Sequence, residues 1–497
     1  MQFTSFEFLC FFPVVVLMYY VIPKKLRQLW LLLASYYFYM GWNAQYALLI
    51  LASTVTTYLC AVFMGDAHDR NRKGFCKWVL AAGLVVNLAI LVFFKYFYFL
   101  CDAADAVLSV FGVRMAAPAL DLVLPVGISF YTFQALGYVI DVYRGTVKPE
   151  KNFIRYALFV SFFPQLVAGP IERSGSLLGQ LEKIPHGKSW DFDKVTRGLL
   201  LMLWGFFMKM VIADRAAVLV NQVYDKYYLY SGTALFLAAV LFAVEIYCDF
   251  AGYSSIALGA AMILGIRLMV NFEAPFFATS IRALWRRWHI SLSTWFRDYL
   301  YIPLGGNRCS RPRRYFNSMV TFAVSGLWHG AGWNFVVWGV LQGVYIVIGD
   351  MTTPVRTKWN HFFGVRVKTF GYQLCQGICT FLLFVFSFIF FRSDTVGDGV
   401  YYIQRMFLHF DVWSFFDESV YYLGLDRKEM GVLWMGIFIL IVVDAYFVRK
   451  RALFDSLVKE QCLAVQYVIV AALLVMVILF GVYGEGYDAA QFIYFQF

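Results

Sequence analysis

Two of the six histidines in the sequence, His289 and His329, differ from the others in their surroundings, and His329 stands in an apolar run, where an imidazole can exchange a proton without a competing charge nearby. His329 lies in VSGLWHGAGWNFVVWGVL (324–341), and no acidic residue falls within a helical turn of it. An ionisable side chain in an apolar segment indicates a functional site, and burial keeps an imidazole neutral and able to accept a proton. We therefore predict that His329 acts as a general base. The alternative is a structural imidazole that is bonded to a backbone carbonyl.

His289 lies forty residues earlier, in the stretch WRRWHIS (285–291). One interpretation is that it positions a hydroxyl or another hydrogen-bond donor near His329 and so assists proton transfer. The other is an interfacial histidine beside tryptophan and arginine side chains, which are common at the level of lipid headgroups. The remaining four histidines lie in polar loops or near charged residues, and we expect no direct role for them.

The same part of the chain gathers basic side chains among tryptophans and tyrosines, at Arg286, Arg287, Arg297 and Arg308. These arginines form either a basic loop at the membrane surface or the wall of a binding site. Further polar residues stand in apolar surroundings and need partners whatever the function: Glu245, Asp249, Asn271 and Glu273. We interpret this second group as structural.

The elements that must position these side chains are helices in a membrane. Of the 497 residues, 61% are hydrophobic and 15% are charged, and a mean hydropathy of +0.66 does not suit a water-soluble surface. Inside lipid, long apolar runs form helices, and about 20 residues cross the hydrocarbon. We predict an all-α polytopic membrane protein with about 11 transmembrane helices plus re-entrant segments. The apolar runs include 29–40, 79–100, 199–212, 235–247, 380–391, 433–443 and 463–482.

Several function classes are disfavoured by what the sequence lacks. It contains no GxxxxGK[ST], HExxH or GxGxxG motif, which argues against a nucleotide-driven motor or a zinc protease. Nine cysteines show no CxxC spacing, so we expect neither a metal site nor a disulfide framework. The formal net charge of +11 comes from cations in short loops between apolar runs, which fits membrane orientation better than binding to nucleic acid. The first 25 residues read as a first span and not as a cleaved signal.

Basic loops orient the chain in the bilayer. Clusters near Lys24, Arg72, Lys148, Arg311 and Arg449 are predicted to face the cytoplasm, which leaves both termini extracytoplasmic. We predict a single membrane domain over 1–497. Its parts are peripheral scaffold helices (1–120), a catalytic core (121–350), C-terminal helices (351–484) and an extracytoplasmic tail (485–497).

Two local patterns predict special packing inside this domain. FVSFFPQLVAGPIER (159–173) places proline and glycine in a short apolar run, which indicates a broken or re-entrant element surrounded by protein. Gly339 and Gly343 stand four residues apart in an apolar helix, which is typical of a close helix-packing face.

Several long blocks resemble the membrane-bound O-acyltransferase family, in the bacterial branch that modifies cell-envelope polysaccharides. The similar proteins act in alginate and peptidoglycan O-acetylation and, more distantly, in D-alanine transfer to teichoic acids. The resemblance covers essentially the whole chain. The blocks are LPVGISFYTFQALGYVIDVYRG (124–145), FPQLVAGPIER (163–173), DFAGYSSIALG (249–259), NFEAPFFATSIRALWRRWHISLSTWFRDYLYIPLGGNR (271–308) and GLWHGAGWNF (326–335).

The resemblance implies a ring of helices around a central tunnel that opens to the cytoplasm. It maps the family's essential histidine onto His329 and the histidine of the WRRWHISLS block onto His289. It also implies an acyl thioester as donor, acetyl-CoA above all, and no tightly bound cofactor. The four arginines of 286–308 would then surround the mouth where the donor docks, because the arginine fork suits the phosphates of coenzyme A.

The last six residues, FIYFQF, form an aromatic tail. Tails of this kind are common in the family, and in the teichoic-acid system a comparable tail carries a tyrosine thought to hold the acyl group transiently. That resemblance falls on Tyr494, which is either an acyl relay or part of a terminal anchor.

The resulting hypothesis is an acyltransferase that moves an acyl group from a cytoplasmic thioester towards an envelope polysaccharide. The chain has no GxSxG motif, so a separate extracytoplasmic transferase of the SGNH type is expected to finish the transfer. A transporter or lipid flippase is the alternative, although the sequence lacks the inverted repeats and midplane carboxylates of that class. A non-catalytic scaffold is a third, and it would not need His329.

Overall fold

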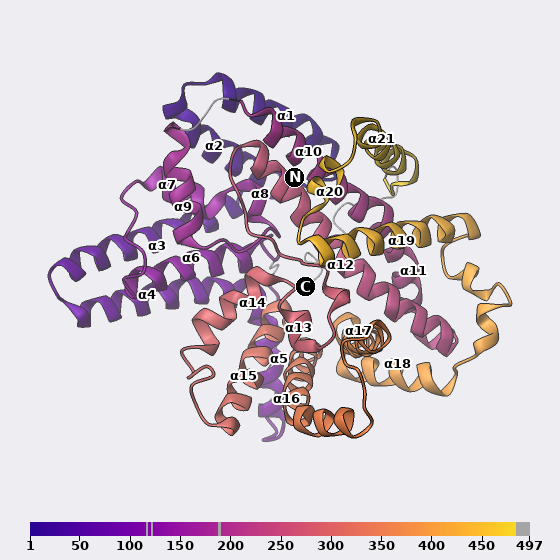
Figure 1. Cartoon of the computed structure of the whole chain (residues 1–497). Coiled ribbons are helices and arrows are strands. Elements are labelled where there is room, and N and C mark those ends of the chain that lie inside the picture. Colours follow the sequence, from indigo (N-terminus) through magenta and orange to yellow (C-terminus); the bar gives the residue numbers. More distant parts are fainter. Residues whose placement is uncertain (116–117, 121–122, 187–189, 484–497) are drawn as a thin grey trace. The chain divides into compact units, whose positions relative to one another are not determined.

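The computed structural model describes residues 1–115, 118–120, 123–186 and 190–483, and every regular element in these residues is helical (Figure 1). This confirms the prediction of an all-α polytopic membrane protein. Eight helical segments in this part of the chain are long and apolar enough to cross a membrane. They are Tyr46–Asp69, Lys73–Ser109, Phe192–Asp225, Gly232–Ile263, Trp333–Phe362, Phe370–Arg392, Arg427–Lys450 and Leu463–Phe480. The count of about 11 spans stays a prediction.

The chain forms two compact units. The first comprises 1–199 and 256–269, and the second comprises 200–255 and the described residues from 270 onwards. The division into scaffold, core, C-terminal helices and tail stays a prediction.

The first unit is built from nine N-terminal helices, of which α3, α4 and α6 lie side by side (Figure 1). The predicted break in the chain is present, because α7 ends at Ser161 and the short α8 begins at Phe163. All of α8 and the last six residues of α7, Tyr156–Ser161, are buried, as broken backbone in a membrane protein requires. The bounds are α1 Phe6–Val21, α2 Arg27–Met40, α3 Tyr46–Asp69, α4 Lys73–Leu91, α5 Phe97–Ser109, α6 Ile128–Tyr143, α7 Phe153–Ser161, α8 Phe163–Leu166 and α9 Ser174–Lys183.

The segment that follows α12 (Gly232–Ile263) is fixed within this unit by two polar side chains. The Glu172 carboxylate, which is buried, accepts the backbone N–H of Met269, and burial raises its pKa to about 7. The Gln180 amide donates to the carbonyl of Arg267 and accepts that residue's N–H. Together these bonds pin the loop that leads out of α12.

The second unit carries both candidate histidines. Its helices are the π-helical turn η4 (Phe207–Ala213), α11 Asp214–Asp225, α13 Ile281–Trp285, α14 Ile290–Phe296, the π-helical turn η7 (Arg297–Tyr301), α15 Arg311–His329, α16 Trp333–Phe362, α17 Phe370–Arg392, α18 Val396–Leu408, α19 Arg427–Lys450, α20 Phe454–Lys459 and α21 Leu463–Phe480. Two helices, α10 (Phe192–Phe206) and α12, contribute to both units.

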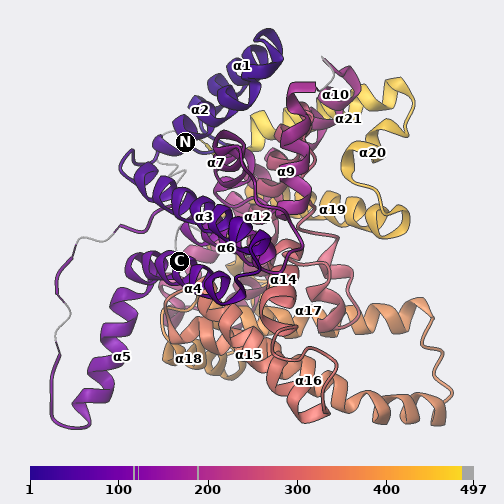
Figure 2. The same cartoon turned by 90° about the vertical axis from the view of Figure 1, so that its left-hand side faces the viewer.

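Helices α15 and α16 pack closely through glycines, side by side in Figure 2. A Cβ atom on Gly339 would lie 2.2 Å from the carbonyl oxygen of Phe322, and one on Gly326 would lie 2.2 Å from that of Phe335. A Cβ atom on Gly343 would lie 2.9 Å from the Met319 sulfur. The predicted packing face is therefore confirmed, and it fixes the end of α15 that carries His329.

A buried ion triad ties η4, α11 and α12 together within this unit. The Lys209 ammonium lies 2.7 Å from Asp214 Oδ1 and 2.7 Å from Asp249 Oδ1. Charges removed from water need such partners. Asp249 stands in an apolar run and was expected to need a polar partner, and the Lys209 ammonium is that partner.

Candidate active site

His329 is the last residue of α15, where Gly330 ends the helix in an extended conformation. Its side chain is 4% exposed and is enclosed by aromatic rings. The ring centroids of Trp328, Trp338 and Phe391 lie 5.0, 5.1 and 5.5 Å from that of the imidazole. An apolar enclosure of this kind strengthens any electrostatic or proton-transfer interaction made inside it.

His289 lies between α13 and α14, outside the eight candidate spans, and is 1% exposed. Its backbone is left-handed, with φ +43°, which costs a residue other than glycine about 1–3 kcal/mol and persists only where surrounding contacts hold it. Its ring packs edge-on against Phe250, with the two centroids 4.7 Å apart. Burial lowers the pKa of His289 to about 3, so the imidazole is neutral at physiological pH.

The fold brings these two histidines together. Their ring centroids lie 6.3 Å apart with an angle of 63° between the ring planes. Trp328 contacts both rings, with centroids 6.0 Å from His289 and 5.0 Å from His329. Two buried imidazoles at this separation can serve a single reacting group, one by taking a proton and the other by orienting the group.

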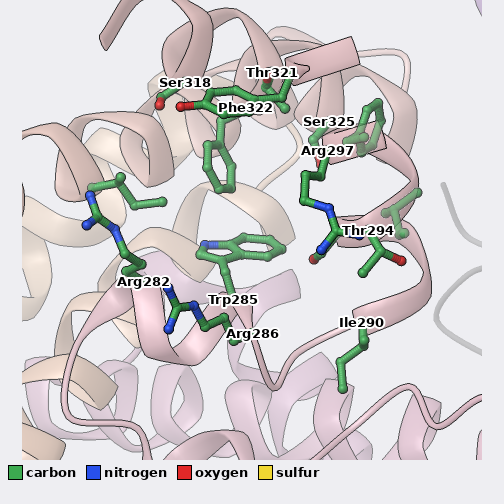
Figure 3. A pocket seen from close by; sticks show the side chains of 15 residues that line it. Arg282, Trp285, Arg286, Ile290, Thr294, Arg297, Ser318, Thr321, Phe322 and Ser325 are labelled. Carbon is green, nitrogen blue, oxygen red and sulfur yellow. The ribbon is translucent and has the colours of Figure 1, made fainter. Parts of the chain in front are cut away.

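A cavity of about 460 Å³ lies along α13, α14, η7 and α15 (Figure 3). Trp285 stands in its middle and faces the ring of Phe322, and the two centroids are 5.0 Å apart. From α15 the cavity is lined by Ser318, Thr321 and Ser325, which share one face of the helix. His329 follows Ser325 by one turn on that face.

Basic side chains line this cavity at Arg282, Arg286 and Arg297 (Figure 3). Arg282 is paired with Asp350 at 3.3 Å, and Arg297 is paired with Asp298 at 2.7 Å. Arg286 is exposed, and within the described residues its side chain makes no hydrogen bond or ion pair. A cavity with this rim can receive a ligand that carries phosphates.

The four predicted arginines are thus not all in one place. Arg286 and Arg297 line the cavity, whereas Arg287 and Arg308 do not. Arg287 instead donates to the carbonyl of Ala274, and Arg308 is exposed. The sequence analysis missed Arg282, although its spacing of four residues from Arg286 would have placed both on one helical face.

The remaining predicted polar residues have these positions. Asn271 donates to Ser254, Glu273 pairs with Arg451 at 3.4 Å, and Asp249 belongs to the Lys209 triad. Glu245 is buried in α12. Tyr494 lies outside the described residues. Within the described part of the chain, no group of three or more histidine, cysteine, aspartate or glutamate side chains could hold a metal ion.

Comparisons with known proteins bear on what this site does. The sequence profile of the membrane-bound O-acyltransferase family matches residues 151–391, a range that includes both histidines and the cavity. The chain is 35% identical over 457 residues to a probable alginate O-acetylase of Pseudomonas aeruginosa, covering 92% of this chain and 83% of that protein. The chain belongs to the membrane-bound O-acyltransferase family.

Two more relatives show which branches of the membrane-bound O-acyltransferase family it resembles. A peptidoglycan O-acetyltransferase of Helicobacter pylori is 31% identical over 427 residues, covering 80% of this chain and 77% of that protein. A teichoic acid D-alanyltransferase of Streptococcus thermophilus is 29% identical over 235 residues, covering 45% of this chain and 56% of that protein. Membership in the family makes the chain a membrane O-acyltransferase, and the transporter alternative is not favoured.

Proposed function

We propose that the protein moves an acetyl group from a cytoplasmic thioester, acetyl-CoA, towards a hydroxyl of a cell-envelope polysaccharide. The observation that carries this proposal is the pair of buried histidines, 6.3 Å apart. Neither histidine lines the arginine-rimmed cavity, but Ile290, next to His289, and Ser325, one turn before His329, do. The relatives named as an alginate O-acetylase and a peptidoglycan O-acetyltransferase support the choice of an acetyl group and of a polysaccharide.

In the proposed reaction His329 removes the proton from an attacking hydroxyl. The hydroxyl oxygen forms a bond to the thioester carbonyl carbon, the carbon–sulfur bond breaks, and the departing thiolate takes the proton from the imidazolium. His289, which is neutral, assists by orienting the reacting group. The products are an ester and a free thiol, so no net proton is consumed.

The arginine-rimmed cavity is proposed as the place where the donor docks. Arg286 supports this role best, because its guanidinium is exposed at the rim and is not committed to a partner in the described residues. Arg297 lines the same cavity. Arg287 and Arg308 do not line it, and they would attract the donor only through the positive charge that they add to this region.

The proposed setting is the bacterial cytoplasmic membrane, with both termini extracytoplasmic and the basic loops inside. Tyr494 is proposed to relay the acetyl group to a separate SGNH-type transferase outside. Cysteines introduced near 311–314 should react with a membrane-impermeant reagent only from the cytoplasmic side. Labelling of those positions from outside alone would overturn the orientation.

The function is tested most simply in cells. Deleting the gene should remove ester-linked acetate from the envelope polysaccharide, and the wild-type chain should restore it. Unchanged acetate in the deleted strain would contradict the proposal. Acetate that is restored equally well by His329→Ala would indicate a transport or scaffold role instead.

A further inference from the structure

We infer that Asn271 is a positioning residue, which holds the backbone of His289 in the left-handed conformation that sets its imidazole beside His329. The inference rests on the proposed function, because it concerns the orientation of a side chain that the proposal places in catalysis. Asn271 is itself fully buried, and its contacts run to the backbone around His289 and to α12.

The segment that begins at Asn271 lies alongside the backbone on both sides of His289. After His289, the N–H of Ile290 donates to the carbonyl oxygen of Asn271 at 2.9 Å. The N–H of Ser291 donates to the side-chain Oδ1 of Asn271 at 3.3 Å. Before it, the N–H of Glu273 donates to the carbonyl oxygen of Arg287 at 2.9 Å. Residues 271–273 therefore bracket the left-handed backbone at His289, and the next residue of the bracketing segment, Ala274, is left-handed as well, with φ +48°.

The amide of Asn271 ties this bracket to α12. Its Nδ2 donates to Ser254 Oγ at 3.2 Å. One turn earlier on α12, Phe250 packs edge-on against the His289 ring. The backbone of His289 and its imidazole are thus both located by α12, the first through Asn271 and the second through Phe250.

Removal of the Asn271 side chain would keep the two backbone bonds of the bracket, but it would remove the bond from the Ser291 N–H to Oδ1 and the tie to Ser254 on α12. Histidine disfavours this conformation, because its Cβ atom approaches the following carbonyl. The backbone at 289 would relax towards an ordinary conformation, and the imidazole would turn away from its present direction. Removal of the Asn271 side chain should therefore lower the rate of acetyl transfer only by the amount that His289 contributes to it.

A double-mutant cycle on acetyl transfer in proteoliposomes tests this dependence. Asn271→Ala and His289→Ala are each expected to lower the rate by about 10- to 100-fold, with little change in the KM for the donor. In the His289→Ala background, Asn271→Ala should have no further effect beyond about twofold. Independent, multiplicative losses would overturn the inference, as would a wild-type rate in Asn271→Ala.

Asn317 provides a matched control, because it is an equally buried asparagine of the same unit whose amide donates to the carbonyl of Gly306 and not to residues 271–291. If Asn317→Ala lowers the rate of acetyl transfer at all, it should lower it by the same factor in the wild-type and in the His289→Ala background. Ser254→Ala is the milder variant to use if Asn271→Ala fails to fold. It removes only the hydroxyl that accepts the hydrogen bond of the Asn271 amide. That variant should show a smaller loss, also absent in the His289→Ala background; a loss that persists there would overturn the inference.

A second readout does not depend on acyl transfer. Diethyl pyrocarbonate modifies accessible neutral imidazoles, and mass spectrometry locates the adduct. The buried His289 should react slowly in wild type and in Asn317→Ala, and at least about tenfold faster in Asn271→Ala. Equal reactivity in all three proteins would overturn the inference. If His289 reacts faster in Asn271→Ala but the wild-type protein transfers no acetyl group, the positioning role stands and the proposed function fails.

Discussion

The imidazoles of His289 and His329 face each other across 6.3 Å between ring centroids, although forty residues separate them in the sequence. Neither belongs to a candidate membrane span. One stands at the end of a helix that is packed by glycines, and the other stands at a left-handed turn between two short helices. The pairing therefore depends on local backbone geometry at two separate places.

Replacement of His289 by asparagine should lower the rate of acetyl transfer by about 10- to 100-fold without changing the shape of its pH profile. Asparagine tolerates left-handed backbone, so the change isolates the loss of the imidazole. Because burial lowers the pKa of His289 to about 3, this group stays neutral from pH 5 to 9 and contributes no inflection there. Loss of a wild-type inflection in His289→Asn would show that His289 titrates in the working range, against this account.

Arg286→Ala should raise the KM for acetyl-CoA by about 5- to 20-fold and leave kcat nearly unchanged, because a docking contact binds ground state and transition state alike. The effect should shrink at high salt, since the side chain is exposed. Arg308→Ala is the control, because Arg308 is also exposed but does not line the cavity. Equal changes in KM for the two variants would assign the effect to general surface charge.

Gly326→Ala should destabilise the protein by about 1–3 kcal/mol, the usual effect of overpacking. The new methyl group would lie 2.2 Å from the Phe335 carbonyl, so α15 and α16 must separate. Gly349→Ala is a control on α16, because nothing lies within 4 Å of the position a Cβ would take. Unfolding in detergent measures both variants. A loss in Gly349→Ala as large as that in Gly326→Ala would contradict the packing explanation.

Tyr494→Phe keeps the aromatic ring and removes only the hydroxyl. If the tail relays the acyl group, this variant should lose polysaccharide acetylation while the protein still accumulates in the membrane. A free tyrosine phenol has a pKa of about 10, so a phenol that attacks the thioester at neutral pH needs a base such as His329. Full acetylation in Tyr494→Phe would make the tail an anchor. An acetyl adduct on the C-terminal peptide, absent in His329→Ala, is the positive result to look for by mass spectrometry.

The sequence predicted those features that depend on composition and short spacing. Apolar runs indicated the helices, proline and glycine indicated the break after Ser161, and two glycines four residues apart indicated the α15–α16 contact. Features that depend on tertiary contacts could not be predicted from the sequence. The left-handed backbone of His289 arises from the bracket around it, and Arg287 turns towards Ala274 while its neighbour Arg286 lines the cavity.

The central claim is that His329 is the base for acyl transfer. Its most direct test is the release of free thiol from acetyl-CoA by purified protein in proteoliposomes, with wild type, His329→Ala and the exposed His361→Ala compared at equal folded amounts. The account predicts that His329→Ala lowers the rate by about 100- to 10,000-fold while His361→Ala stays within about twofold of wild type. A folded His329→Ala protein that releases thiol at the wild-type rate would contradict it.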